Sequence, residues 1–106
     1  MPKYLFEVSY TAEGVGGVRK EGGSSRKTMV EKLVQNLGGT LENFYFAFGD
    51  HDVYLIADLP SNTDVAAVSM TVGATGAATV KTVVLMTPEE VDEAAQKTVD
   101  YRAPGT

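Results

Sequence analysis

The sequence contains no cysteine and only one histidine, His51. The absence of cysteine excludes a disulfide framework, a thiolate nucleophile and a thiolate metal site, and it agrees with a reducing compartment. One histidine without cysteine does not supply the usual zinc ligands, although a two-fold dimer would present His51 twice. No loop has the ligand spacing that Ca²⁺ sites use. We therefore expect a cytoplasmic protein with neither a metal ion nor another cofactor.

Long apolar runs are also absent. No stretch approaches the roughly 18 apolar residues that a membrane span requires, and Met1-Pro2-Lys3 leads directly into a strand-like pattern without a signal segment. The formal net charge of −5 argues against binding to nucleic acid. The basic residues nonetheless cluster, at Arg19, Lys20, Arg26, Lys27 and Lys32. This cluster indicates either a solvated helix face or an anion-attracting rim around a pocket.

The pattern of the 106 residues predicts one α+β domain over residues 1–106. Alternating apolar residues predict strands at 3–11, 40–48, 52–59 and 79–86. Apolar spacings of three and four residues predict helices at 24–37, 61–72 and 88–99, followed by a fraying tail at 102–106. The Thr11 cap predicts a short helical piece at 11–21, which three glycines weaken. This order is the ferredoxin-like βαββαβ arrangement, an antiparallel sheet with helices on one face, followed by a C-terminal helix.

Several helix ends have recognisable signals. Glycine readily adopts the left-handed conformation that ends a helix, so Gly38-Gly39 is expected to end the second one. The expected N-terminal caps are Thr11, then Ser24 or Ser25, then a capping box of Ser61 and Asp64, and finally Thr87-Pro88-Glu89-Glu90.

The segment 41–56 contains five of the nine aromatic residues. Within it, residues 44–48 have large rings on both faces of one strand, and residues 53–56 and 83–86 are also apolar on both faces. An antiparallel sheet with one wet face would instead alternate apolar and polar residues. The two main helices can cover only one face, so the other must be covered by the terminal helix or by a second copy of the chain. We expect a homodimer.

Four sequence motifs together resemble the GYD domain family: Tyr10-Thr11-x-Glu13-Gly14, Gly22-Gly23-Ser24, Leu37-Gly38-Gly39, and Phe44-Tyr45-x-x-Phe48-Gly49-Asp50-x-Asp52. The resemblance covers residues 3–88 and implies the dimeric α/β-barrel class, in which two ferredoxin-like sheets pack face to face. The family's usual hairpin motif is Gly-x-Tyr-Asp, and His51 stands here in place of the tyrosine. A role of that tyrosine hydroxyl is therefore not carried over, and the family implies no particular reaction.

The common catalytic motifs are missing. The glycine-rich segment 14–24 lacks the lysine of a phosphate-binding loop, and Arg19 occupies the third glycine position of a dinucleotide fingerprint. The serines have no nucleophile-elbow context, so we do not expect a serine hydrolase. Three charged residues fall within strand-like runs, where they lie either at a rim or beside a cavity: Glu7, Asp58 and Lys81.

His51 is the only side chain that changes charge near neutral pH without a special environment. It is either a base or ligand donor at a pocket mouth, or a strand-end residue satisfied by local hydrogen bonds. Asp52 is expected to bond backbone groups of the turn. The residues predicted to contact a ligand are His51, Asp50, Arg19 and Tyr10.

The resulting functional expectation is a homodimeric small-molecule-binding or sensing module. Its cleft between sheet and helices would hold a small apolar or aromatic ligand, because such pockets are mostly apolar with a few convergent polar groups. The alternative is a cofactor-independent enzyme of the oxygenase or isomerase type, as the dimeric α/β-barrel class implies. The sequence leaves open whether the chain catalyses a reaction.

Overall fold

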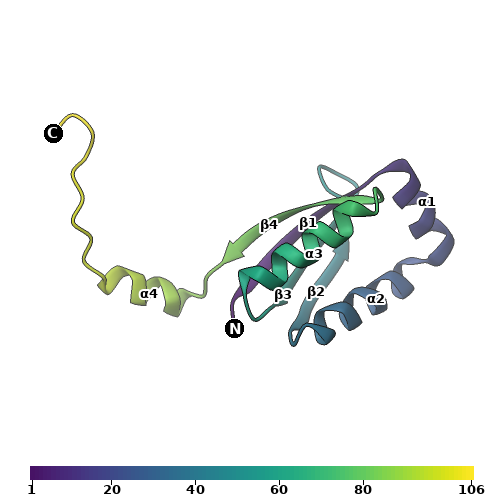
Figure 1. The fold of residues 1–106 in the computed structure, drawn as a ribbon, viewed down its shortest axis with the longest axis horizontal. Coiled ribbons are helices and arrows are strands. Elements are labelled where there is room, and N and C mark those ends of the chain that lie inside the picture. The colour runs from purple at the N-terminus through teal and green to yellow at the C-terminus, as the bar shows by residue number, and fades with distance from the viewer.

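The computed structural model describes all residues, 1–106, and contains one four-stranded antiparallel sheet (Figure 1). Its strands are β1 (Lys3–Tyr10), β2 (Thr40–Phe46), β3 (Val53–Asp58) and β4 (Ala78–Leu85). They lie in the order β2-β3-β1-β4, so the two strands nearest the chain ends in sequence, β1 and β4, are neighbours. Each strand begins and ends within two residues of its predicted bounds.

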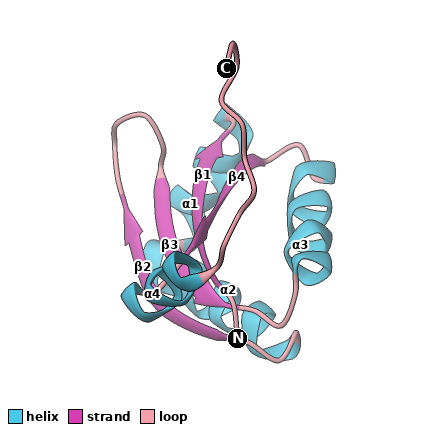
Figure 2. Ribbon diagram, turned by 90° about the vertical axis from the view of Figure 1, so that its left-hand side faces the viewer, coloured by secondary structure: helices cyan, strands magenta, loops and turns pink.

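The four helices are α1 (Ala12–Glu21), α2 (Gly23–Asn36), α3 (Asn62–Ala74) and α4 (Pro88–Gln96). Helix α2 packs over β2 and α3 packs over β4, on the same side of the sheet (Figure 2). The predicted α+β class with an antiparallel sheet is confirmed, and the order of elements is consistent with the ferredoxin-like arrangement. None of the helices is both long and apolar enough to cross a membrane.

Strand β1 divides the sheet into two faces, because successive side chains of a strand point in opposite directions. Tyr4 and Phe6 are buried on the face beneath the helices, which we call the covered face. Leu5, Glu7 and Ser9 point to the opposite face, which we call the open face. Antiparallel register then assigns Val53, Leu55 and Ala57 of β3 to the covered face, where they complete the buried core.

Strand β2 contains an irregularity that changes which of its side chains face the core. The pairing with β3 shifts between Leu41 and Asn43, as in a β-bulge. Because of the extra residue, Leu41, Phe44 and Phe46 all pack against the core of the covered face. Strict alternation from Leu41 would have turned both phenylalanines toward the open face. Tyr45 is instead the β2 ring on the open face, and it is 67% exposed.

The helix caps were predicted with mixed success. Thr11 accepts a hydrogen bond from the Gly14 amide, and Thr87 forms the complete capping box with Glu90, so both caps are confirmed. The prediction that Ser24 or Ser25 caps α2 is wrong. Gly22, with φ of +94°, turns the chain directly from α1 into α2, so both serines lie inside the first turn.

Ser61 is the N-cap residue of α3, but the capping box predicted there is not formed. The Ser61 hydroxyl donates to the Asp64 carboxylate at 3.0 Å instead of accepting a backbone amide. The end of α2 agrees with the prediction, because Gly38 follows the helix with φ of +85°. Gly39 is needed for a different reason, since a Cβ atom there would lie 2.1 Å from the Asp58 carbonyl oxygen.

Helix α4 and the residues after it project from one end of the body, beyond β4 (Figure 1). Every residue from Pro88 onward is exposed. The helix ends at Gln96, three residues earlier than predicted, because Lys97 adopts an extended conformation with φ of −77° and ψ of 134°. The terminal helix therefore does not fold across the open face, which was one of the two predicted coverings.

Candidate functional site

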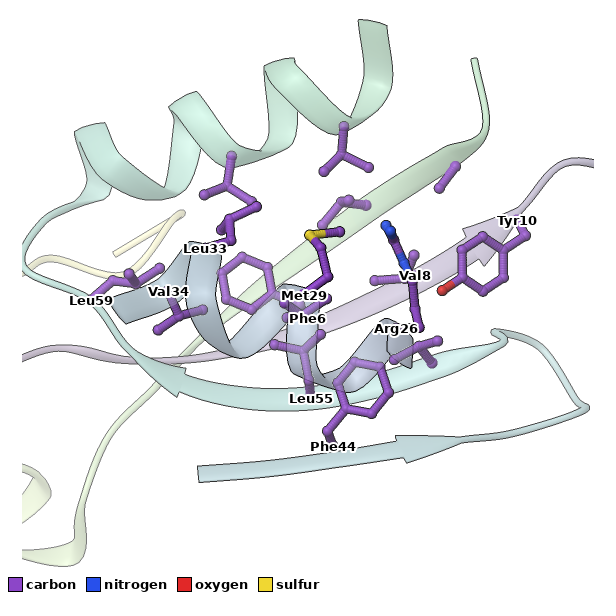
Figure 3. A pocket seen from close by; sticks show the side chains of 16 residues that line it. Phe6, Val8, Tyr10, Arg26, Met29, Leu33, Val34, Phe44, Leu55 and Leu59 are labelled. Atoms are coloured by element: carbon purple, nitrogen blue, oxygen red, sulfur yellow. The ribbon is translucent and has the colours of Figure 1, made fainter. Parts of the chain in front are cut away.

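An apolar cavity lies between the covered face and helices α2 and α3 (Figure 3). The volume of the cavity is about 70 Å³. Fifteen of its 16 lining residues are hydrophobic. The labelled residues of Figure 3 that line it are Phe6, Val8, Tyr10, Arg26, Met29, Leu33, Val34, Phe44, Leu55 and Leu59.

The sequence builds this cavity from two periodicities. Period two along β1 brings Phe6, Val8 and Tyr10 onto one face, and they form the floor. Spacings of three and four along α2 bring Met29 and Leu33 onto the facing side. Helix α3 contributes Val68 and Val72 to the lining, so the side of the cavity under α3 is formed by short branched side chains.

Arg26 is the only charged residue in the lining. It lies three residues before Met29, on the same side of α2 as the apolar stripe. Its side chain is partly buried, and it takes part in none of the ion pairs or side-chain hydrogen bonds of the structure. The lining thus combines an apolar surface with one guanidinium that has no protein carboxylate beside it.

A polar cluster occupies the open face, on the other side of the same strands. His51 Nδ1 lies 2.9 Å from the Ser9 hydroxyl oxygen, and His51 Nε2 lies 3.0 Å from Oε2 of Glu7. The ring also meets Tyr54 edge to face, with ring centroids 5.8 Å apart. One tautomer satisfies both contacts: Nε2–H donates to Glu7 while Nδ1 accepts the Ser9 hydroxyl. His51 is therefore oriented on both sides, as a proton acceptor for a serine would be.

Asp52 has the backbone role expected from the sequence. Its carboxylate accepts a hydrogen bond from the Tyr10 amide at 2.7 Å, and its own amide donates to the Val8 carbonyl at 2.8 Å. Together with the Ala47–Asp52 backbone bond, these contacts fix the 47–52 turn against the end of β1. The turn holds His51 over the open face.

The four residues predicted to contact a ligand do not converge. Tyr10 lines the cavity, whereas His51 faces the open side of the sheet. Asp50 is exposed in the 47–52 turn, and Arg19 is exposed on α1. A part for His51, Asp50 and Arg19 in ligand binding stays a prediction.

The sequence analysis included Arg26 in the basic cluster, with a pocket rim as one alternative, but did not name it as a ligand contact. Its place beside the cavity was detectable, because it continues the three-to-four spacing of the apolar residues on α2 toward the N-terminus. The meeting of Glu7 and Ser9 with His51 had no local signal, since 42 residues separate Ser9 from His51. No group of three or more His, Cys, Asp or Glu side chains is arranged to hold a metal ion.

These observations define a class of protein: an antiparallel α+β domain whose sheet is covered by helices on one face, with an apolar cavity between them. A model of the GYD domain family matches residues 4–95, most of the chain, and the chain belongs to this family. The expected resemblance is thereby confirmed. No curated protein matches the sequence.

Proposed function

We propose that the protein is a small-molecule-binding or sensing module that holds an apolar ligand in the cavity between sheet and helices. The lining supports this proposal most directly, since fifteen of its 16 residues are hydrophobic. Ligand sites are typically apolar hollows with a few polar groups that orient the ligand. Tyr10 and Arg26 supply such groups here.

The size of the cavity limits the ligand. A cavity needs roughly 10–15 Å³ to hold one water molecule, and this cavity has a volume of about 70 Å³. Several waters in so apolar a space would lack hydrogen-bond partners, so a small apolar ligand fits better than solvent does. The size suits a single ring or a short branched chain.

The proposed module is a homodimer in which two copies pack through their open faces. Ile56, Leu5 and Val83 form an apolar row across β3, β1 and β4 on the open face, because Leu5 pairs with both of the others. Helix α4 leaves this row uncovered. The ion pair of Lys3 with Asp58, 2.9 Å long, borders the row on one side, and Glu7 and Lys81 border it on the other. Each border of the row thus carries one positive and one negative side chain. Such a surface suits a two-fold contact, in which each copy meets the same surface of its partner.

A cofactor-independent enzyme is the second candidate function. One observation favours it, namely that both ring nitrogens of His51 are engaged, by Glu7 and by Ser9. A base oriented in this way can accept a proton from a substrate or from the serine. This chemistry would occur on the open face, so it does not use the apolar cavity.

Thermal unfolding with a panel of small aromatic and branched aliphatic compounds tests the binding proposal. A ligand that binds only the folded state raises Tm in a concentration-dependent way. Val72→Phe, which fills part of the cavity lining, should abolish the rise. Met70→Phe, on the exposed side of the same helix, should preserve it.

The proposal fails if no compound raises Tm, or if Val72→Phe and the native chain respond alike while both are folded. Turnover of a binding compound that disappears in His51→Phe would instead support the enzyme.

A further inference from the structure

We infer that the ligand of the cavity is an apolar carboxylic acid whose carboxylate pairs with Arg26. This inference rests on the proposed function and adds the chemical class of the ligand. Its basis is the presence of one unpaired guanidinium in a lining that is otherwise entirely hydrophobic.

The absence of an internal partner is the first step. The close contacts between basic and acidic side chains in the structure involve Lys3 and His51 and not Arg26, and no acidic residue belongs to the cavity lining. A partly buried guanidinium loses hydration and gains stability only if an anion or acceptors replace the water. A ligand carboxylate can accept two parallel N–H bonds from one arginine, which matches the guanidinium geometry.

The second step is the position of the polar groups within the cavity. Tyr10 is the last residue of β1, and Arg26 lies in the N-terminal half of α2. Leu59 and Val34 lie toward the other end, since Leu59 bonds the backbone of Pro2 before β1 and Val34 belongs to the last turns of α2. Figure 3 shows the Tyr10 hydroxyl directed toward the cavity, with Arg26 and Val8 between it and the apolar end. The site is therefore amphipathic, with its donors at one end.

The third step is the match of charge and size. One arginine balances one negative charge, so a monocarboxylate suits the site better than a phosphate ester with two charges. The cavity of about 70 Å³ suits a small acid whose hydrocarbon part is a single ring or a short branched chain. The hydrocarbon part would contact Phe6 and Leu55, and the Tyr10 hydroxyl would donate a second hydrogen bond to the carboxylate.

Calorimetric titration with matched probes tests the inference at pH 7.5, where simple carboxylic acids are ionised. The probes are phenylacetate with 2-phenylethanol, and 4-methylpentanoate with 4-methylpentan-1-ol. The native protein should bind each acid about ten- to a hundredfold more tightly than its alcohol, as expected for a charge-assisted hydrogen bond. Arg26→Gln should lose this preference while retaining its affinity for the alcohols.

Arg102→Gln is the matched control, because Arg102 is exposed in the segment after α4 and lies outside the lining. It should keep the native preference for acids, and Arg26→Lys should restore part of it. Equal affinity of the native protein for acids and alcohols would overturn the inference and leave the proposed function intact. The same holds if Arg26→Gln keeps the preference. If neither probe of either pair binds the native protein, both proposals fail for ligands of this size.

Discussion

The two faces of the sheet are built from the same strands and differ in what surrounds them. On the covered face, Tyr4, Phe6 and Leu55 are at most 7% exposed and pack beneath α2 and α3. On the open face, the alternate residues of β1 include Leu5 and Glu7, which no helix covers. Neighbours in one strand thus belong to different environments. A substitution on the covered face should change the stability of the single chain, whereas one on the open face should change association.

The polar groups of the two faces differ in the same way. Arg26 beside the cavity has no protein partner, while Glu7, Ser9 and His51 on the open face satisfy one another. A group left without a partner next to an apolar hollow points to a ligand from outside. The contacts of His51 with Glu7 and Ser9 need no ligand, because they already explain how the 47–52 turn is held. This contrast is the reason for preferring the cavity as the binding site.

The largest effect is expected for Phe6→Ala on the covered face. Phe6 is 4% exposed and contributes both to the core and to the cavity floor. Removal of the ring should lower the free energy of unfolding by about 3–5 kcal/mol, measured by urea denaturation. A loss below about 1 kcal/mol would contradict the described core.

The next effect concerns the neighbouring residue on the open face. Leu5→Glu introduces one carboxylate per copy into the proposed contact, so the dimer dissociation constant should rise about a hundredfold or more. Light scattering after size exclusion measures this, with the exposed Met70→Glu on α3 as control. A native monomer mass at every concentration would remove the dimer and leave the cavity proposal standing, because the cavity lies on the other face.

A smaller loss is expected at the turn that leads from α2 into β2. Gly38→Val forces a β-branched residue to φ of +85°, and this should destabilise the fold by about 1–3 kcal/mol. Gly16 has open space around it and no positive φ, so Gly16→Val is the control in the same denaturation experiment. Equal midpoints for the Gly38→Val and native proteins would show that the left-handed turn is dispensable.

The smallest effect is expected for His51→Phe, which leaves Glu7 and Ser9 without their partner. The loss of the hydrogen bonds should cost about 1–2 kcal/mol of stability, with the edge contact to Tyr54 partly retained. Affinity for a cavity ligand is measured in the same variant. A fall in affinity would support the sequence-based assignment of His51 to the ligand site, and an unchanged affinity would restrict His51 to the open face.

Much of the local structure was predictable because its causes are local. The capping box at Thr87 depends on residues within three positions, and the left-handed Gly38 depends on one residue with no Cβ. The start of α2 was mispredicted because Gly22 provides a sharp turn that makes a serine cap unnecessary. The β2 bulge was missed because it is recognised only from pairing with β3.

The candidate site likewise contains one feature with a local cause and one that depends on residues far apart in the chain. The sequence analysis named Arg26 only within the basic cluster, and its spacing to Met29 and Val30, which is a helical period, could have singled it out. The contacts of His51 with Glu7 and Ser9 depend on the 47–52 turn returning to the end of β1, and the sequence contains no periodic signal for that return.

The sequence by itself determined the order and type of the elements, the family, and the apolar stripes that must be buried, because periodicity and caps are properties of neighbouring residues. Only the tertiary structure decided that Arg26 lies beside an apolar cavity, that His51 lies on the opposite face, and that α4 leaves that face open. These facts depend on strand order, on the bulge and on the path of the 47–52 turn. Each arises from contacts between residues far apart in the chain, so tertiary packing alone fixes them.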